Sequence, residues 1–255
     1  MVLAHRTALA LAAVSIAGVT GAQSRPISPA DPGTRRLAVD ATALRAGQFV
    51  YVTTLERDAS TTPLGTRTVT VSRTTYVGGP AWLLLEERSG DGIPASDSLF
   101  ADPAALRAIH WSSTLGTARL AAEFRGDSTF GATSSPQGKR SIVAAVPAGT
   151  VVSAAMLETM LRLLPLQTTW EDSTTTLSVT PSGNAVLPTR IAVIGEDRVR
   201  VPAGTFDCWV VAVHADSARG LYWVTKQDPI VVRSALDVPT LGGAQLVSAL
   251  ERIAQ

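Results

Sequence analysis

The chain has 255 residues, of which 22 are basic and 21 acidic, so it has no global electrostatic reason to bind nucleic acid or an anionic membrane surface. Its single cysteine, Cys208, excludes an internal disulfide, so a hydrophobic core must stabilise the fold. The length suffices for one large β-domain or two small ones.

The first 22 residues are typical of a secretory signal peptide. His5 and Arg6 precede an apolar run over residues 8–19, and the small residues at 20–22 would allow cleavage. An uncleaved membrane anchor is the alternative. No later segment is long and apolar enough to span a bilayer. We therefore expect a periplasmic or secreted protein that has no transmembrane segment after signal cleavage.

The next segment differs from the rest of the chain. Residues 23–46 carry several prolines and no strand alternation, which predicts an exposed, flexible leader with a short helical turn near 40–45. From Gly47 onward, strand patterns dominate. The clearest covers 64–76, where arginine and valine alternate with threonine and serine. With no fixed-period repeat present, residues 47–255 are predicted to form one β-rich domain.

Turn residues divide this domain into short strands. The expected strands lie at 48–57, 64–76, 81–87, 96–100, 109–113, 118–124, 128–133, 141–146, 174–180, 185–195, 199–202, 208–216, 220–226 and 230–236. Residues 245–253 fit a strand and a helix equally well. Asp102-Pro103 favours a helix start, because an N-cap residue precedes a proline at the first helical position.

One segment has a full helical pattern. It covers residues 153–164 and stops before Pro165. Glu158, Thr159 and Arg162 share a narrow polar arc, in which Glu158 and Arg162 form a favourable i,i+4 pair. Apolar side chains cover most of the remaining surface, namely Met156, Leu157, Met160, Leu161, Leu163 and Leu164. So wide an apolar surface implies contacts on more than one side of the helix.

No pattern of catalytic or metal-ligating residues is evident. His110 and His214 are the only histidines after the signal segment, and neither has ligand spacing with Cys208. A hydrolase would need one of these histidines beside a serine or an acid in a cleft. Paired acids are interpreted as solvated strand ends or turns, at Glu86-Glu87, Glu171-Asp172 and Glu196-Asp197. We therefore expect no enzymatic activity, no metal and no cofactor.

The segment 199–236 resembles a known family. The similar residues are Val199-Arg200-Val201-Pro202-Ala203-Gly204-Thr205-Phe206-Asp207-Cys208, then Leu221-Tyr222-Trp223-Val224 and Ile230-Val231-Val232-Arg233, with Leu161-Arg162-Leu163-Leu164-Pro165-Leu166 resembling the family's middle. This pattern resembles an uncharacterised family of secreted bacterial proteins of unknown function. That family is grouped with the periplasmic lipoprotein-carrier and lipoprotein-receptor superfamily, the Lol-like half-barrels. The resemblance extends from Gly47 to the C-terminus.

The resemblance implies a mainly β fold. It consists of a strongly curved antiparallel sheet, an incomplete barrel, with one helix in its concave side. In the best-known relatives, the half-barrel shelters acyl chains of lipidated proteins. The family has no established catalytic residues, and a shared fold does not transfer a function.

Two functions from different classes are consistent with these patterns. The first is non-enzymatic binding of an apolar ligand, a lipid or acyl chain, between sheet and helix. The contacts would come from Met156, Leu157, Met160, Leu161 and Trp223. The alternative is a structural or protein-interaction module of the cell envelope, with a solid core and a partner bound at a sheet edge. Tryptophans in a sheet more often fill a core than line a cavity.

Overall fold

The computed structural model describes residues 37, 39–90, 94–180, 183–216 and 218–254. Within these residues the chain forms fourteen strands, one α-helix and two short 3-10 helices. The signal peptide expected at residues 1–22 and the first part of the expected leader lie outside the described residues.

Strands make up most of the described chain. The elements in chain order are η1 (Ala41–Ala43), β1 (Gly47–Arg57), β2 (Ser60–Tyr76), β3 (Gly79–Ser89), β4 (Ala95–Ala101), β5 (Ala108–Leu115), β6 (Ala118–Arg125), β7 (Ser128–Ser135), β8 (Gly138–Ala145), α1 (Ala154–Leu161), β9 (Glu171–Thr180), β10 (Gly183–Val201), β11 (Gly204–Ala215), β12 (Ala218–Thr225), β13 (Val231–Val238), η2 (Pro239–Leu241) and β14 (Ala244–Ala254).

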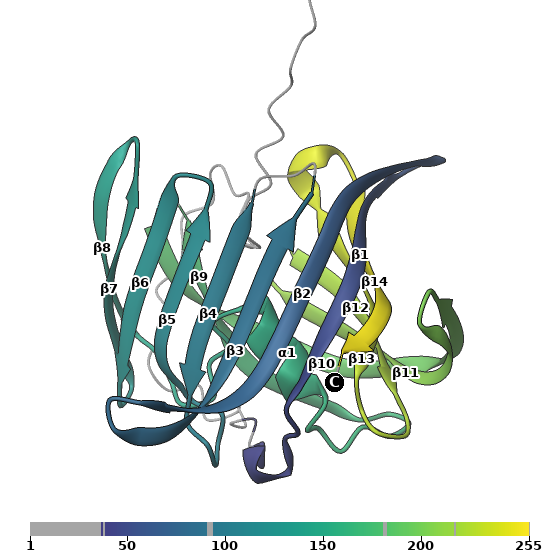
Figure 1. Cartoon of the computed structure of the whole chain (residues 1–255), viewed down its shortest axis with the longest axis horizontal. Coiled ribbons are helices and arrows are strands. Elements are labelled where there is room, and N and C mark those ends of the chain that lie inside the picture. Colours follow the sequence, from purple (N-terminus) through teal and green to yellow (C-terminus); the bar gives the residue numbers. More distant parts are fainter. Residues whose placement is uncertain (1–36, 38, 91–93, 181–182, 217, 255) are drawn as a thin grey trace, which may run out of the picture.

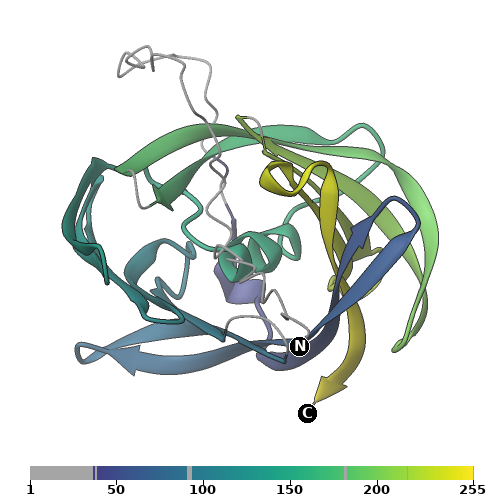
Figure 2. The same cartoon turned by 90° about the horizontal axis from the view of Figure 1, so that it is seen from above.

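All the described strands belong to one antiparallel sheet, in the order β8-β7-β6-β5-β4-β3-β2-β1-β14-β13-β12-β11-β10-β9. Strands that follow one another in sequence pair with one another, except β8 and β9, which form the two edges of the sheet, and β1 also pairs with β14. The chain leaves the sheet between β8 and β9, and there it forms α1. Figures 1 and 2 show the sheet curving around this helix without closing into a barrel. The predicted fold class is confirmed.

Helix α1 is buried along almost its whole length. Every residue from Ala155 to Leu161 is buried, including Glu158 and Thr159. The helix is shorter than predicted, because Arg162 is its C-cap and Leu163 N–H bonds to Met160 O in a tighter turn. Its wide apolar surface therefore meets the concave side of the sheet, as the sequence pattern indicated.

The N-terminus of α1 depends on one side chain. Ser153 is the N-cap, and its Oγ accepts a hydrogen bond from Met156 N at 3.2 Å. We expect Ser153→Ala to lower the free energy of unfolding by about 1 kcal/mol, because a helix N–H loses its partner. Urea denaturation would measure this loss, with Ser141→Ala on the exposed part of β8 as the control. Equal stabilities of the two variants would contradict the prediction.

The last part of the expected leader is packed into the core. Leu37, Ala41 and Leu44 are buried, and Ala41 N–H donates to Ala104 O at 2.7 Å. Asp40 caps the short helix η1, which matches the turn expected near 40–45. The prediction of an exposed leader is therefore wrong for this part, because three apolar residues in a proline-rich segment find places against the sheet.

The expected helix at Asp102 is a turn. Asp102 Oδ1 accepts from Ala104 N at 3.0 Å and from Ala105 N at 2.7 Å, as an N-cap would. Leu106 then adopts a positive φ of 52°, and β5 begins at Ala108. The predicted capping role of Asp102 is confirmed, but too few residues separate β4 from β5 for a helix.

Two further expectations are resolved by strand pairing. The predicted hairpin turn at Glu196-Asp197 is absent, because β10 runs as one strand in which Glu196 pairs with Trp209 and Asp197 with Cys208. A bulge between Val193 and Gly195 interrupts the alternation there. The ambiguous segment at 245–253 is strand β14, since it pairs with both β1 and β13.

The two edge strands are partly covered. On β9, Val151 N–H donates to Thr175 O and Leu177 N–H donates to Val151 O, both at 2.8 Å. On β8, Val143 O accepts from Asn184 Nδ2 at 3.4 Å. These contacts occupy backbone groups that would otherwise be open to a pairing strand.

Candidate functional site

The residues expected to contact a ligand are buried. Met156, Met160 and Leu161 are at most 1% exposed, and Leu157 and Trp223 are 9% exposed. The four helical residues lie together on α1. Trp223 follows Tyr222 in β12, so the two side chains point to opposite faces of that strand.

Trp223 has polar and cationic neighbours. Its Nε1–H donates to Asp197 Oδ2 at 2.9 Å, and the Arg233 guanidinium lies 4.9 Å from the ring centroid. None of the four helical residues, nor Trp223, lines either of the two hollows described next. The predicted helix is confirmed and these apolar side chains are closely packed, while their contact with a ligand stays a prediction.

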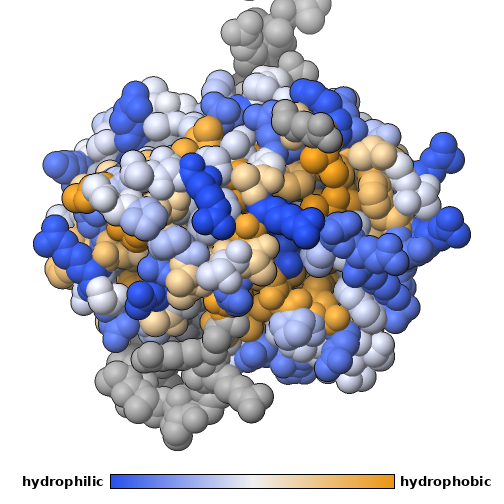
Figure 3. Space-filling view, turned by 60° about the horizontal axis from the view of Figure 1, so that its bottom comes forward, coloured by the Kyte–Doolittle hydropathy of each residue, from blue (hydrophilic) through white to orange (hydrophobic). Residues whose placement is uncertain are grey.

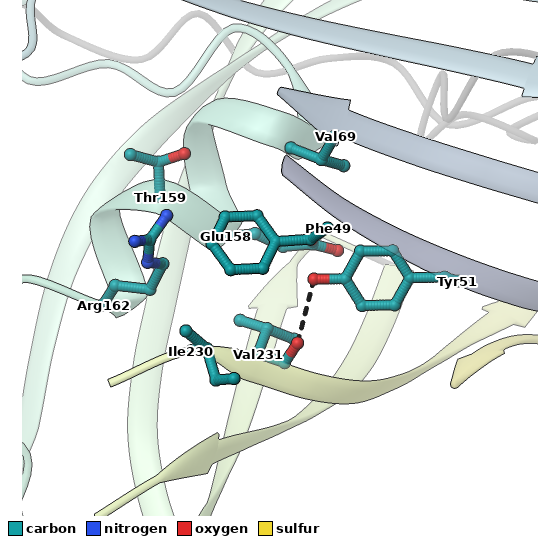
Figure 4. A pocket seen from close by; sticks show the side chains of 8 residues that line it. All are labelled: Phe49, Tyr51, Val69, Glu158, Thr159, Arg162, Ile230 and Val231. Atoms are coloured by element: carbon teal, nitrogen blue, oxygen red, sulfur yellow. Dashed lines mark hydrogen bonds between the residues drawn. The ribbon is translucent and has the colours of Figure 1, made fainter. Parts of the chain in front are cut away.

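The first hollow, hollow 1, lies between one end of α1 and the sheet (Figure 4). It is lined by Phe49, Tyr51, Val69, Glu158, Thr159, Arg162, Ile230 and Val231, and its volume is about 10 Å³. Tyr51 Oη–H donates to Val231 O at 2.9 Å, so β1 and β13 are joined across it. That volume is close to the room needed for one water molecule.

Arg162 covers hollow 1 from the helix side. Its guanidinium lies 4.7 Å from the centroid of the Phe49 ring. Its Nε donates to Pro229 O at 3.1 Å and its Nη2 donates to Arg45 O at 3.4 Å. Burial lowers the pKa of Arg162 from its ordinary value. One side chain thus connects the end of α1 to the segment before β1 and to the loop before β13.

The second hollow, hollow 2, is more polar. It is lined by Thr53, Arg67, Arg88, Ala154, Glu158, Ser234, Leu236, Leu246 and Ser248, and its volume is about 20 Å³. Thr53 Oγ1 and Glu158 Oε2 are buried and have no hydrogen-bond partner within the described part of the chain. Such orphaned polar atoms are uncommon in folded proteins, and each needs an explanation.

A buried charge network borders hollow 2, and its member Glu158 lines both hollows. Arg67 Nη1 donates to Glu158 Oε1 and its Nη2 to Glu86 Oε2, each at 2.8 Å. Arg88 Nε donates to Glu86 Oε1 at 2.7 Å. Arg67, Glu86 and Glu158 are at most 5% exposed. The network therefore fixes α1 to β2 and β3 in the interior of the protein.

This network corrects two sequence interpretations. Glu158 was expected on a polar arc beside Arg162, but its partner is Arg67 on a strand 91 residues earlier. Glu86 was expected at a solvated strand end and is instead buried. The available signal was the alternation in 64–76, which places Arg67 on the same face as Val69 and Val71. An arginine on an apolar strand face is buried, and a buried charged side chain is almost always paired, so buried acids are its expected partners.

The carboxyl groups near this network differ in their acidity. Burial alone would raise the pKa of Glu86, but Arg67 and Arg88 lower it to about 2. Burial raises the pKa of Glu158 despite its pairing with Arg67. Burial, together with the charge of Glu86, raises the pKa of Asp97 to about 7. Asp97 Oδ1 also accepts from Trp111 Nε1 at 2.9 Å.

The histidines and the cysteine lie apart from this region. His110 Nδ1 is 2.8 Å from Glu123 Oε1, which also accepts from Tyr76 Oη at 3.1 Å. His214 is exposed on β11, and Cys208 is buried on the same strand, where burial raises the pKa of its thiol to about 12. Over the described ranges, no group of three or more His, Cys, Asp or Glu residues could hold a metal ion.

The comparisons with known proteins identify the class and then the family. The sheet and its enclosed helix define a mainly β domain with a single large antiparallel sheet. Residues 50–244 match the family "Protein of unknown function (DUF3108)", and the chain belongs to that family. The expected membership in a family of unknown function is confirmed, while its relation to the Lol-like carriers stays a prediction. No curated protein matches the chain.

The solved structures that are similar to this chain include a protein from Bacteroides fragilis that is described as exported and as having a YmcC-like fold. The two share 13% identity and a TM-score of 0.32, over 86% of this chain and 100% of the other.

The described part of the chain contains no helix that is long and apolar enough to cross a membrane.

Proposed function

We propose that the protein is an exported, non-enzymatic binding protein that takes an apolar ligand, a lipid or acyl chain, between α1 and the curved sheet. The site is hollow 1, and the observation that carries the proposal is the position of the Arg162 side chain over it. Arg162 lies across an otherwise largely apolar hollow at the helix–sheet interface, and hydrogen bonds to two backbone carbonyls hold it there.

The surroundings of hollow 1 support this choice. Phe49, Val69 and Val231 supply apolar lining, and Ile230 and Leu163 are only partly buried next to the core. Figure 3, which brings the lower end of the molecule in Figure 1 forward, shows apolar side chains gathered on that face and crossed by a few charged ones. Apolar area left on a surface of this kind is a common feature of ligand-binding sites.

An acyl chain does not fit the hollow as it stands. A volume of about 10 Å³ is far below the several hundred Å³ typical of ligand sites. Ligand binding therefore requires Arg162 to rotate outward and α1 to shift. Rotating Arg162 breaks two hydrogen bonds and one cation–π contact, each worth about 1 kcal/mol. The cost of rotating Arg162 is small compared with the burial of an acyl chain, since each buried methylene contributes about 0.8 kcal/mol. The shift of α1 adds a cost of its own, because Arg67 pairs with Glu158 on that helix.

The experiment measures lipid and an apolar fluorophore in the same preparations. We expect lipid mass spectrometry of the purified protein to find a co-purifying acyl compound. We also expect delipidated protein to bind N-phenyl-1-naphthylamine. Arg162→Ala should bind it about fivefold more tightly, equivalent to about 1 kcal/mol, because the cover no longer competes. Arg190→Ala, in an exposed ion pair with Glu171, is the matched control. Absence of both lipid and fluorophore binding would refute the proposal.

A second candidate is the interaction module of the cell envelope. Phe130 on β7 and Val143 on β8 are cross-strand partners, with 49% and 66% of their surface exposed. An exposed apolar pair beside an edge strand favours contact with another protein. A photo-crosslinker placed at residue 143 in intact cells should then capture one specific protein, whereas a crosslinker at the exposed Arg200 should not.

A further inference from the structure

A row of hydroxyl groups faces α1 in hollow 2. Thr53, Ser248 and Ser234 are directly paired across β1, β14 and β13, and all three are buried. Directly paired side chains on one sheet face lie about 5 Å apart at Cβ. Glu158 lines the same hollow from α1. The hollow thus combines hydroxyl groups with a carboxylate oxygen that has no hydrogen-bond partner among the described residues.

The unpartnered atoms define what the hollow can accept. Glu158 Oε2 needs a hydrogen-bond donor when it is ionised, and Thr53 Oγ1 can donate or accept. A second carboxylate would lose its hydration beside Glu158, and the guanidinium groups of Arg67 and Arg88, already paired with Glu86 and Glu158, offer it little net attraction. An ammonium group would lose its hydration beside two guanidinium groups, those of Arg67 and Arg88. A neutral hydroxyl meets both needs, because it donates and accepts without adding charge.

The two hollows are close along β1. Phe49 and Tyr51 line hollow 1, and Thr53 lines hollow 2. Alternate residues of a strand share a face and are about 7 Å apart. Glu158 borders both hollows from α1. An apolar ligand that enters under Arg162 and follows the inner face of β1 would therefore bring its leading end to Thr53, once the side chain of Tyr51, which lies between Phe49 and Thr53 on that face, moves aside.

From this geometry we infer that hollow 2 binds one neutral hydroxyl group at the inner end of the apolar ligand. The inference rests on the proposed function and names the ligand class, an apolar chain that ends in an alcohol. A volume of about 20 Å³ suits a single hydroxyl group and excludes a larger head group. In the free protein, one water molecule has the size and the hydrogen-bonding capacity to occupy this position.

The test compares four ten-carbon ligands that differ only in the group at one end. Delipidated protein is titrated with 1-decanol, decanoate, decylamine and decane by displacement of N-phenyl-1-naphthylamine. We expect 1-decanol to bind at least about tenfold more tightly than decanoate or decylamine. Thr53→Val should weaken 1-decanol binding about tenfold and leave decane binding unchanged. Thr54→Val, one residue along β1, is the matched control, and Ser248→Ala provides a second variant within the hydroxyl row.

The outcomes separate the two claims. Equal binding of all four ligands, or tighter binding of decanoate than of 1-decanol, would overturn the hydroxyl site and leave the proposed function standing. Equal loss of decanol and decane binding in Thr53→Val would also overturn it. Failure of every chain to bind would refute the proposed function itself and, with it, this inference.

Discussion

Replacing Arg67 with methionine should lower the free energy of unfolding by about 3–5 kcal/mol. The substitution removes the buried cation that pairs with both Glu86 and Glu158. Arg88 still contacts Glu86, but within the described part of the chain the ion pair of Glu158 Oε1 is with Arg67 alone. A buried charge without a partner is among the most destabilising changes in a protein interior. Urea or thermal denaturation would measure the loss.

Two further variants separate this mechanism from lost packing. Arg190→Met removes an exposed ion pair with Glu171 and should change the free energy of unfolding far less than Arg67→Met, because solvent screens that pair. Arg67→Met combined with Glu158→Met should recover about 2 kcal/mol, because the stranded carboxylate is removed and an apolar pair replaces it. A loss at Arg67 no larger than that at Arg190, or no recovery in the double variant, would show that the network does not fix α1 to the sheet.

The sequence predicts the sheet well because alternation is a local property. The strand at 64–76 and the helix after Ser153 each depend on residues close in the chain, and the structure confirms both in outline. The segment 245–253 could not be assigned from its own residues, since its apolar pattern fits the period of a helix and that of a strand. Only its pairing with β1 and β13 makes it a strand, and those partners lie far away in sequence.

The candidate site was harder to predict, because it is built from distant contacts. Alternation places Arg67 on the inner face of its strand, but nothing local indicates that Glu158 will be its partner. The residues expected to bind a ligand were chosen for being apolar. The hollows are lined instead by the polar residues of the same helix, Glu158 and Arg162, and by β1. A helix buried on all sides makes its few polar side chains the informative ones.

The raised pKa of Asp97 should lower the free energy of unfolding as the pH rises from about 4 to about 7. Its pKa is about 7 in the folded protein, where burial and the charge of Glu86 favour the protonated form, and its ordinary value is 3.8. Between these values the unfolded chain has lost this proton and the folded protein retains it. The folded state therefore binds more protons, and its stability falls with rising pH until Asp97 ionises in both states.

Glu86 has the opposite effect at lower pH. Its pKa is lowered from 4.5 to about 2, because Arg67 and Arg88 outweigh its burial. Its contribution to stability is present above pH 4.5 and is lost as the pH falls toward 2. The two groups together predict a maximum of stability near the pH where Glu86 is ionised and Asp97 is still protonated in the folded protein.

Asp97→Asn isolates the first of these effects, because asparagine stays neutral and can still accept a hydrogen bond from Trp111 Nε1. We expect the variant to match the unmodified protein near pH 4 and to exceed its free energy of unfolding by about 1–3 kcal/mol at pH 8. Urea denaturation at several pH values would measure the difference. Asp207→Asn, at an exposed position 3.8 Å from Arg198, should follow the unmodified protein throughout. If Asp97→Asn did the same, the carboxyl of Asp97 would be ionised in the folded protein at neutral pH, and Glu86 and Asp97 would stand as paired negative charges on neighbouring strands.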